Sequence, residues 1–369
     1  SHGLANRISI QDSHLMLRFH PPLVIFACLS LSCSLYTDTE EPDIFFTISD
    51  FDILELGRTI SDMDISPDGT TVYLTDYNNN SFLSVNVVSK MSVTHDFLIG
   101  SHPVAMDLNS DGSAIIVALE GESMIALINT GSMEVIQSFP VSLMNMNDLA
   151  FINDSTIIIS SKTDPSCITL SINDGFQSSQ SVLNGEFAMD TENGILFVAT
   201  TSSIKKYHWN GEQFYQDTQH ISDPYGFAGQ VHHFIHSSVS NTVFACISGP
   251  HEQEYVKHVY SYYGSDLTFA GKYLINSPGL GAAVSQDGSR VFIAPTDADE
   301  IGVFVVEFDQ STKLEEKYYL AGGNLTDRGI LVDASGNFIY VLIDSPGDDD
   351  SFEPYNDYSF DLQRITISD

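Results

Sequence analysis

The sequence predicts an all-β ring built from repeated units. Short runs with an apolar residue at every second position alternate with Asp-Gly or Asn-Gly turns, in which glycine accepts the positive φ of a tight hairpin. The turns recur at a regular spacing, with 43 positions from Gly69 to Gly112. A repeat of roughly 40–45 residues is typical of a four-stranded propeller blade. We therefore expect a β-propeller, because a four-stranded unit needs neighbours to cover both of its faces.

Each blade is predicted from one β-branched or aromatic run that follows a turn. Seven such runs occur in the chain, and six or eight blades remain the alternatives if one weak unit is misread. The runs are Val72 to Thr75, Ile115 to Leu119, Thr156 to Ser160, Ile195 to Thr200, Thr242 to Ile247, Arg290 to Ala294 and Phe338 to Ile343.

The two ends of the chain are expected to share the last blade. The C-terminal repeat supplies strands at residues 329–332, 338–343 and 360–367, and then stops one strand short. Near the other end, Ile44 to Ile48 reads as a strand with no repeat unit around it. Pairing the two segments closes the ring and removes open sheet edges. We predict that Ile44 to Ile48 is the outer strand of the seventh blade and that the propeller spans residues 44–369.

Residues 1–33 form a predicted leader. Arg18 precedes a short apolar stretch that is too short to span a membrane and is typical of a secretory signal. The end of the stretch, LSLSCS before TDTEEPD, resembles a bacterial lipoprotein signal, in which the cysteine, here Cys33, carries the lipid. Cys28 as the lipidated residue and a cleaved signal without lipid are the alternatives. Residues 34–43 follow as an acidic linker. Because of the signal-like stretch, we expect an outer-membrane or cell-surface lipoprotein, or a periplasmic or secreted protein.

The charge balance excludes two classes of partner. The chain has 49 acidic and 14 basic residues, for a net charge of −35. Such a surface repels nucleic acid and anionic lipid, so we expect membrane contact only through the lipid anchor. Beyond the leader only Cys167 and Cys246 remain, in different predicted blades, and we expect buried free thiols. No paired-cysteine motif for zinc or covalent haem is present.

Two repeats carry a family resemblance. SPDG followed by TVYLTD, and SQDG followed by RVFIAP, resemble the YVTN-type repeats of exported bacterial and archaeal propellers, a style shared with lactonase-like propellers. The resemblance covers Arg58 to Asp369. It implies the fold, whereas one architecture of this kind hosts many unrelated functions.

The rim at which the inner strands begin is the predicted ligand site. Aligning the repeats places Asp62, His102, Asn147 and Asp327 there. A second set, His102, Glu186, His232 and Arg328, would supply the acid, base and anion-holding groups that open a lactone if these four side chains converge. The alternative is that they are polar rim residues without a catalytic role. His232 and His236 resemble a metal pair, but on a strand they lie about 13 Å apart and cannot share an ion.

One acidic loop is a candidate calcium site. Its carboxylates crowd a turn-rich segment, and calcium takes six to eight oxygen ligands. The candidate ligands are Asp344, Asp348, Asp350, Glu353 and Asp357. A solvated acidic loop is the alternative, and no other cofactor is indicated.

The sequence contains no phosphate-binding loop and no nucleophile elbow. We therefore expect a non-catalytic propeller at the cell surface or in the periplasm, which binds a protein or glycan partner through a rim of the ring. A lactonase-like hydrolase with a rim or channel active site is the first alternative. A structural subunit of an envelope assembly is the second.

Overall fold

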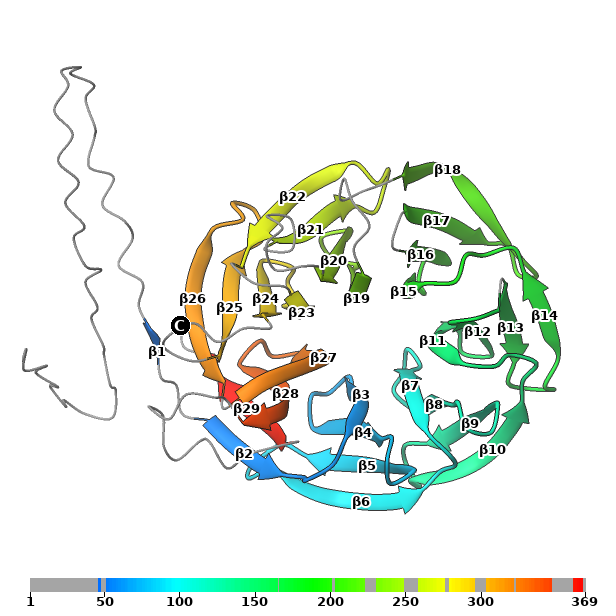
Figure 1. Ribbon diagram of the computed structural model, residues 1–369, viewed down its shortest axis with the longest axis horizontal. Helices are drawn as coiled ribbons and strands as arrows, with labels where there is room; N and C mark the ends of the chain where they lie inside the picture. The colour runs from blue at the N-terminus through cyan, green and yellow to red at the C-terminus, as the bar shows by residue number, and fades with distance from the viewer. Residues whose placement is uncertain are drawn as a thin grey trace, which may run out of the picture.

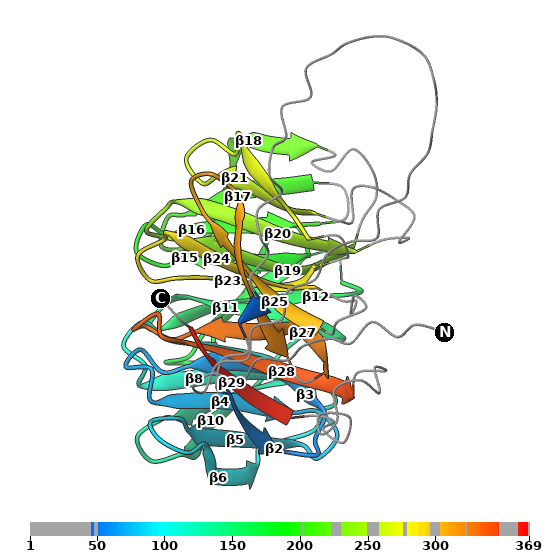
Figure 2. The same cartoon turned by 90° about the vertical axis from the view of Figure 1, so that its left-hand side faces the viewer.

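The computed structural model describes residues 46–47, 51–164, 166–200, 203–222, 230–248, 258–275, 279–295, 303–321, 323–346 and 361–367. In this part of the chain, seven β-sheets stand around a central axis (Figure 1). Seen from the side, the ring is shallower than it is wide (Figure 2). The predicted seven-bladed β-propeller is confirmed.

In blades one to six the strand nearest the axis comes first in the chain, and the following strands lie progressively further out (Figure 1). Blades one to three contain β3 Ile60–Ile65, β4 Thr71–Asp76, β5 Ser81–Asn86 and β6 Ser92–Leu98; β7 Pro103–Leu108, β8 Ala114–Leu119, β9 Met124–Asn129 and β10 Glu134–Pro140; β11 Met146–Asn153, β12 Thr156–Ser161, β13 Cys167–Ser171 and β14 Gln177–Gln180. Blades four to six contain β15 Glu186–Asp190, β16 Ile195–Ala199, β17 Ser203–Trp209 and β18 Phe214–Ser222; β19 Gln230–Ser237, β20 Thr242–Ser248, β21 His258–Tyr263 and β22 Phe269–Leu274; β23 Gly279–Val284, β24 Arg290–Pro295, β25 Val303–Asp309 and β26 Glu315–Ala321. Blade seven contains β27 Gly323–Val332, β28 Phe338–Pro346 and β29 Asp361–Thr366, with β2 Phe51–Glu55 outside them.

The predicted runs fall on the second strand of each blade, between two hydrogen-bonded neighbours. A turn precedes each of these strands. In the first, Gly69 has φ +69°, and the Ser66 hydroxyl donates to Asp68 over 2.6 Å. The Thr70 amide also donates to Asp68, over 3.1 Å. These bonds hold the tight hairpin that the SPDG sequence predicts.

The hydrophobic core lies between the blades. One buried cluster joins Ile116 of blade two to Phe151 of blade three, and another joins Phe244 of blade five to Val291 of blade six. Each sheet is therefore covered by the sheets on either side, as expected for units that cannot bury their own faces. Cys167 and Cys246 are buried in this core and form no disulfide, as predicted.

An N-terminal strand does complete the last blade, but the predicted stretch was wrong. The outer strand is β2, which pairs antiparallel with β29 through partners such as Leu54 and Leu362. Of Ile44 to Ile48, the described residues are β1 Phe46–Thr47, which pairs in parallel with β26 outside blade six. The physical reason is the short link to blade one: only residues 56–59 separate β2 from the inner strand of that blade, so β2 lies beside the last blade of the ring.

Candidate functional site

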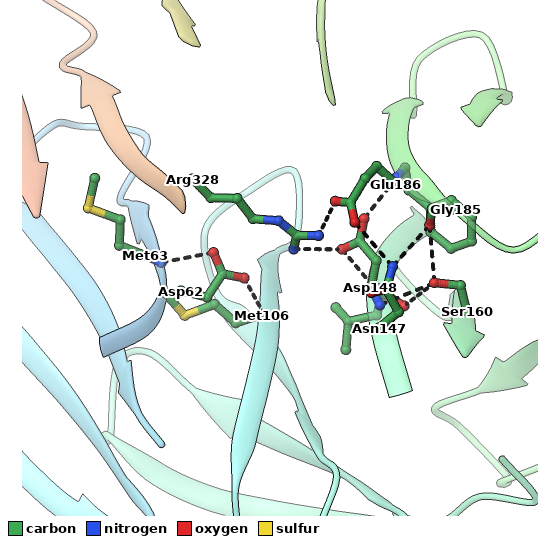
Figure 3. Close-up of polar contacts among 11 residues, drawn as sticks. Asp62, Met63, Met106, Asn147, Asp148, Ser160, Gly185, Glu186 and Arg328 are labelled. Atoms are coloured by element: carbon green, nitrogen blue, oxygen red, sulfur yellow. Dashed lines mark hydrogen bonds and ion pairs between the residues drawn. The ribbon is translucent and has the colours of Figure 1, made fainter. Parts of the chain in front are cut away.

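Five polar residues form one cluster where the inner strands begin, here called the Arg328 cluster: Asp62, Asn147, Asp148, Glu186 and Arg328 (Figure 3). They come from the inner strands of blades one, three, four and seven. Asp62 and Glu186 occupy equivalent places, opposite Thr75 and Ala199 in their hairpins. The propeller repeat therefore delivers these side chains to one end of the central channel.

Arg328 links blades that are not neighbours in the ring. Its guanidinium extends from β27 to Asp148, with 3.3 Å between Nη1 and Oδ1, and it also pairs with Glu186 (Figure 3). Exposed fractions of these three side chains are 17%, 12% and 14%. The Arg328 backbone has φ +57°, and β27 is irregular on either side of Leu325 in its pairing with β28. The left-handed backbone conformation is uncommon for arginine, and here it accompanies a side chain that crosses the middle of the ring.

The carboxylates of the cluster also join successive blades. Asp148 accepts the amide of Leu149 over 2.9 Å and that of Phe187, on the next inner strand, over 2.8 Å. Asp62 does the same with Met63 over 2.9 Å and with Met106 on the next inner strand over 2.8 Å. A carboxylate on one blade therefore caps a backbone N–H of the following blade, which would otherwise need another partner.

Two further residues repeat this bond. Asp107 accepts the amide of Phe151 over 2.6 Å, and the His233 Nδ1 accepts the amide of Ala282 over 3.2 Å. Burial, with the nearby Arg328 charge as a smaller cause, lowers the pKa of His233 to about 3. The imidazole is therefore neutral near pH 7 and can act as an acceptor at Nδ1.

Burial dominates the titration of the carboxylates. It raises the pKa of Asp62 to about 7 and that of Glu186 to about 7, although Arg328 acts against both shifts. Burial also raises the pKa of Asp64 to about 6 and the pKa of Asp107 well above its usual range. For Arg328, burial alone would lower the pKa, but the charges of its carboxylate neighbours outweigh that cost and raise it. Arg328 therefore stays charged while several carboxylates near it are poised to take up protons.

The structure brings together some of the predicted site residues. Glu186 and Arg328 are in contact, and Asn147 donates from Nδ2 to Glu186 Oε1 over 3.2 Å. Asp62 lies close enough to Arg328 for their charges to interact. From the two predicted groups, the structure therefore brings together Asp62, Asn147, Glu186 and Arg328.

Other predicted residues are not members of the Arg328 cluster or lie outside the described part of the chain. His102 is exposed and stacks on Tyr77, with 4.6 Å between the ring centroids. His232 lies at an irregular position of β19, between Val231 and His233 in the pairing with β20. The side chain of Asp327 lies outside the described residues.

The predicted calcium ligands and lipidation site also lie outside the described residues. Cys33, Asp348, Asp350, Glu353 and Asp357 are not among them, and of Asp344 only the backbone, in β28, is described. Within the described ranges, no group of three or more His, Cys, Asp or Glu side chains is arranged to hold a metal ion. Those ranges also contain no helix long and apolar enough to cross a membrane.

Sequence reasoning missed Asp148 by one residue. Asp148 lies 86 positions after Asp62, which is twice the spacing from Gly69 to Gly112. Extending that spacing twice would have found it, but the repeat alignment placed Asn147 there. The pairing of β11 with β12 is irregular after Met146, and this irregularity defeats a simple alternation of inward and outward residues.

Chemically, the cluster is well suited to holding positive charge and poorly suited to holding an anion. The Arg328 guanidinium is already engaged by Asp148 and Glu186, so it is not free to stabilise an oxyanion. Asp62 adds a third carboxylate near the same cation.

No family model and no curated protein matches the chain. Among solved structures it is similar to Kuenenia stuttgartiensis hydrazine synthase, with a TM-score of 0.63 and 11% identity over 85% of this chain and 97% of that chain. It is also similar to the C-terminal WD40 domain of Sif2, with a TM-score of 0.58 and 15% identity over 84% of this chain and 82% of that chain. At such identities the likeness concerns the fold alone, and by that measure the chain is a seven-bladed β-propeller.

Proposed function

We propose that the protein is a non-catalytic binding module that holds a protein or glycan partner on the rim where the inner strands begin. The observation that carries this proposal is the engagement of Arg328 by Asp148 and Glu186. A hydrolase of the kind considered above needs a free cationic group to stabilise the anion formed in its transition state, and here that group is neutralised by the protein itself.

The same rim offers contact groups to a partner. The exposed His102 ring lies flat against Tyr77, and the Met144 side chain, in the loop before β11, is 68% exposed. Aromatic and methionine side chains are common in binding surfaces because they offer large contact areas at low entropic cost. These groups support a partner-binding surface on this rim, and polar residues such as Asn78 and Asn79 follow Tyr77 there.

Position-specific photocrosslinking tests the proposed face. A photoreactive amino acid replaces Met144, and in a matched variant it replaces Val239, which is 64% exposed in the hairpin turn at the other end of the inner strands. The full chain is expressed in its own cells. We expect one recurrent protein or glycan adduct from position 144 and none from position 239. Equal adducts from both positions, or none from position 144, would contradict a partner on this rim.

We further propose that the protein is exported and anchored through a lipid on Cys33, as the resemblance to exported YVTN-type propellers implies. The signal-like sequence before Cys33 supports this. Intact mass of protein from the membrane fraction tests it, because a lipidated chain beginning at Cys33 has a defined mass. A chain that retains Ser1 would contradict export. Elemental analysis of the same sample tests calcium binding by the loop that contains Asp348 and Asp350.

A lactonase-like hydrolase is the second candidate, favoured by the place of Glu186 in the Arg328 cluster beside Asn147 and by its raised pKa, which suits a general acid. A panel of lactones tests it with Glu186→Gln and the control Glu192→Gln, an exposed residue of the same blade. Turnover that Glu186→Gln abolishes and Glu192→Gln leaves unchanged would replace the binding proposal.

A further inference from the structure

The inner strands place three carboxylates, Asp62, Asp148 and Glu186, around one guanidinium. Two more belong to the same group of charges, since Asp64 lies near enough to act on Asp62, and Asp107 near enough to be acted on by Asp64 and Asp148. Every inner strand except β23 of blade six carries titratable or charged residues. These residues are Asp62 and Asp64 on β3, Asp107 on β7, Asp148 on β11, Glu186 and Asp190 on β15, His232, His233 and His236 on β19, and Asp327 and Arg328 on β27, of which Asp327 has no described side chain. Asp190 and His236 lie toward the hairpin turns at the other end of their strands, where they contact Asn193 and Asn241.

The positive charge falls short of the negative charge. Arg328 binds Asp148 and Glu186 directly. Asp62 and Asp107 instead accept backbone amides, those of Met106 and Phe151, and a backbone N–H brings only a partial charge. His233 adds no positive charge near pH 7, because burial keeps it neutral. With all five carboxylates ionised, this region therefore carries several uncompensated negative charges in a poorly solvated place.

Protonation removes that excess without breaking the bonds between blades. A protonated carboxyl group still accepts through its carbonyl oxygen, so Asp62 and Asp107 can keep their amide partners. If Glu186 is also protonated, Arg328 retains Asp148 as a one-to-one ion pair. The blades are then joined through a nearly neutral centre.

We propose that the channel end of this propeller is a proton-controlled closure, in which protonation of Asp62, Asp64, Asp107 and Glu186 tightens the inner strands around the Arg328–Asp148 pair and ionisation loosens them. The proposal does not depend on the identity of a partner, and it stands if the binding function proposed above fails.

The direction of the effect follows from proton linkage. The folded-state pKa values of Asp62 and Glu186, about 7, lie above those of an unfolded chain, so the folded protein binds more protons between about pH 4 and pH 7. Stability from these groups is therefore fully present below the unfolded pKa and is lost as the pH rises through about 7. This is the reverse of the usual behaviour of an ion-paired carboxylate.

Calorimetry on the full chain at about pH 5.5 and about pH 8, at constant ionic strength, tests the proposal. We expect the wild-type Tm to be about 5 °C or more higher at the acid pH. Glu186→Gln, which keeps the shape and the acceptor oxygen, should raise the Tm by about 2–3 °C at pH 8 and leave it unchanged at pH 5.5. The matched control Glu192→Gln removes the same charge from an exposed turn of the same blade, and it should move the Tm by less than about 1 °C at both pH values.

Hydrogen exchange locates the change. After correction for the intrinsic pH dependence of exchange, amides of β27 and β15 should be better protected at pH 5.5 than at pH 8, and in Glu186→Gln this difference should shrink. Asp107→Asn is a second variant, since its amide oxygen can still accept the Phe151 N–H. An equal fall in Tm at both pH values for Glu186→Gln and Asp107→Asn would show that the ionised carboxylates stabilise the fold through their ion pair and hydrogen bond. That result would overturn the proposal.

Discussion

Lys206 is a buried cation that joins blade four to blade five. Its ammonium donates to the carbonyl oxygen of Gly264 over 2.9 Å and to that of Ser265 over 3.0 Å. It also lies 6.0 Å from the centre of the Phe197 ring and 4.0 Å from an Asp217 carboxylate oxygen. A single side chain therefore satisfies two carbonyls of a neighbouring hairpin, a role that an apolar residue cannot take.

Lys206→Met should cost about 2–3 kcal/mol of unfolding free energy, because it keeps the length of the side chain but leaves both carbonyls without their charged donor. Equilibrium urea unfolding measures the change. Lys205→Met is the matched control, since the Lys205 ammonium makes a 3.4 Å hydrogen bond to Gln216 in an exposed position, and its loss should cost less than about 0.5 kcal/mol. Similar losses in the two variants would mean that the carbonyls of Gly264 and Ser265 find water instead.

Individual site residues were predictable where the repeat is regular. Asp62 and Glu186 lie near the starts of inner strands, at equivalent places in their hairpins, so alignment of the repeats found them. Asp148 was missed, although its neighbour Asn147 was named, because one irregular pair in β11 shifts which residue faces inward. His233 was missed in favour of His232 for the same kind of reason in β19. A change of one residue in register exchanges the two faces of a strand, and no composition signal reports it.

At the scale of elements, the hairpin turns contact one another as well as closing their own strands. Gly112 in the turn of blade two has φ +74°, and a Cβ there would lie 2.6 Å from Cδ of Pro67 in the turn of blade one. Across the seam of the ring, the corresponding Gly69 faces Asp333 and Ala334 of blade seven. Both turns therefore favour glycine for their backbone conformation, and Gly112 also needs it for the close approach of Pro67.

Gly112→Ala should destabilise the fold by roughly 2–4 kcal/mol, since alanine meets both the left-handed backbone and the rigid Pro67 ring. Gly57→Ala separates the two effects: Gly57 has φ +62°, but a Cβ there would meet nothing within 4 Å, so only the backbone cost of about 1–2 kcal/mol applies. Chemical denaturation of both variants gives the comparison. If the two substitutions cost the same, the contact between the turns contributes nothing.

The positions of strands along the chain were more predictable than the strands with which they pair. The second strand of each blade was identified because turn residues and β-branched runs mark it locally. The closing strand was misplaced because Ile44 to Ile48 has the apolar pattern of a strand and lies close in sequence to Phe51–Glu55, which is the stretch that pairs with β29. Which one pairs with β29 depends on the length of the link to blade one, a long-range constraint that local pattern does not contain.

At the scale of the whole molecule, two groups of carboxylates respond differently to pH. In exposed turns, hydrogen bonds from nearby hydroxyls and amides lower the pKa of Asp287 to about 2 and that of Asp309 to about 2. Near the channel, burial raises the pKa of Asp62 and Glu186. Mild acid therefore neutralises the centre of the ring while its turns remain charged.

The net charge of −35 makes stability sensitive to salt. Raising NaCl from about 0.02 M to about 0.5 M at neutral pH should increase the Tm by several degrees, because salt screens repulsion between surface carboxylates. Differential scanning fluorimetry of the full chain measures it. The increase should be smaller near pH 5, where fewer carboxylates are ionised. A Tm that falls with salt would indicate that the few surface ion pairs, such as Arg58 with Asp96, outweigh the general repulsion.

The pairing of β2 with β29 also brings the two ends of the seven-bladed ring together. Phe51 and Ile365 are direct partners in this pairing, so the first and last strands of the ring lie one strand spacing apart, about 5 Å. A short peptide linking them, with new termini opened between β14 and β15, would give a circular permutant in which all seven blades are continuous in sequence. Such a molecule would hold its ring shut only by contacts between blade faces. Comparing the refolding of this permutant with that of the original chain would show how much the shared blade contributes to ring closure and how much packing between blades contributes.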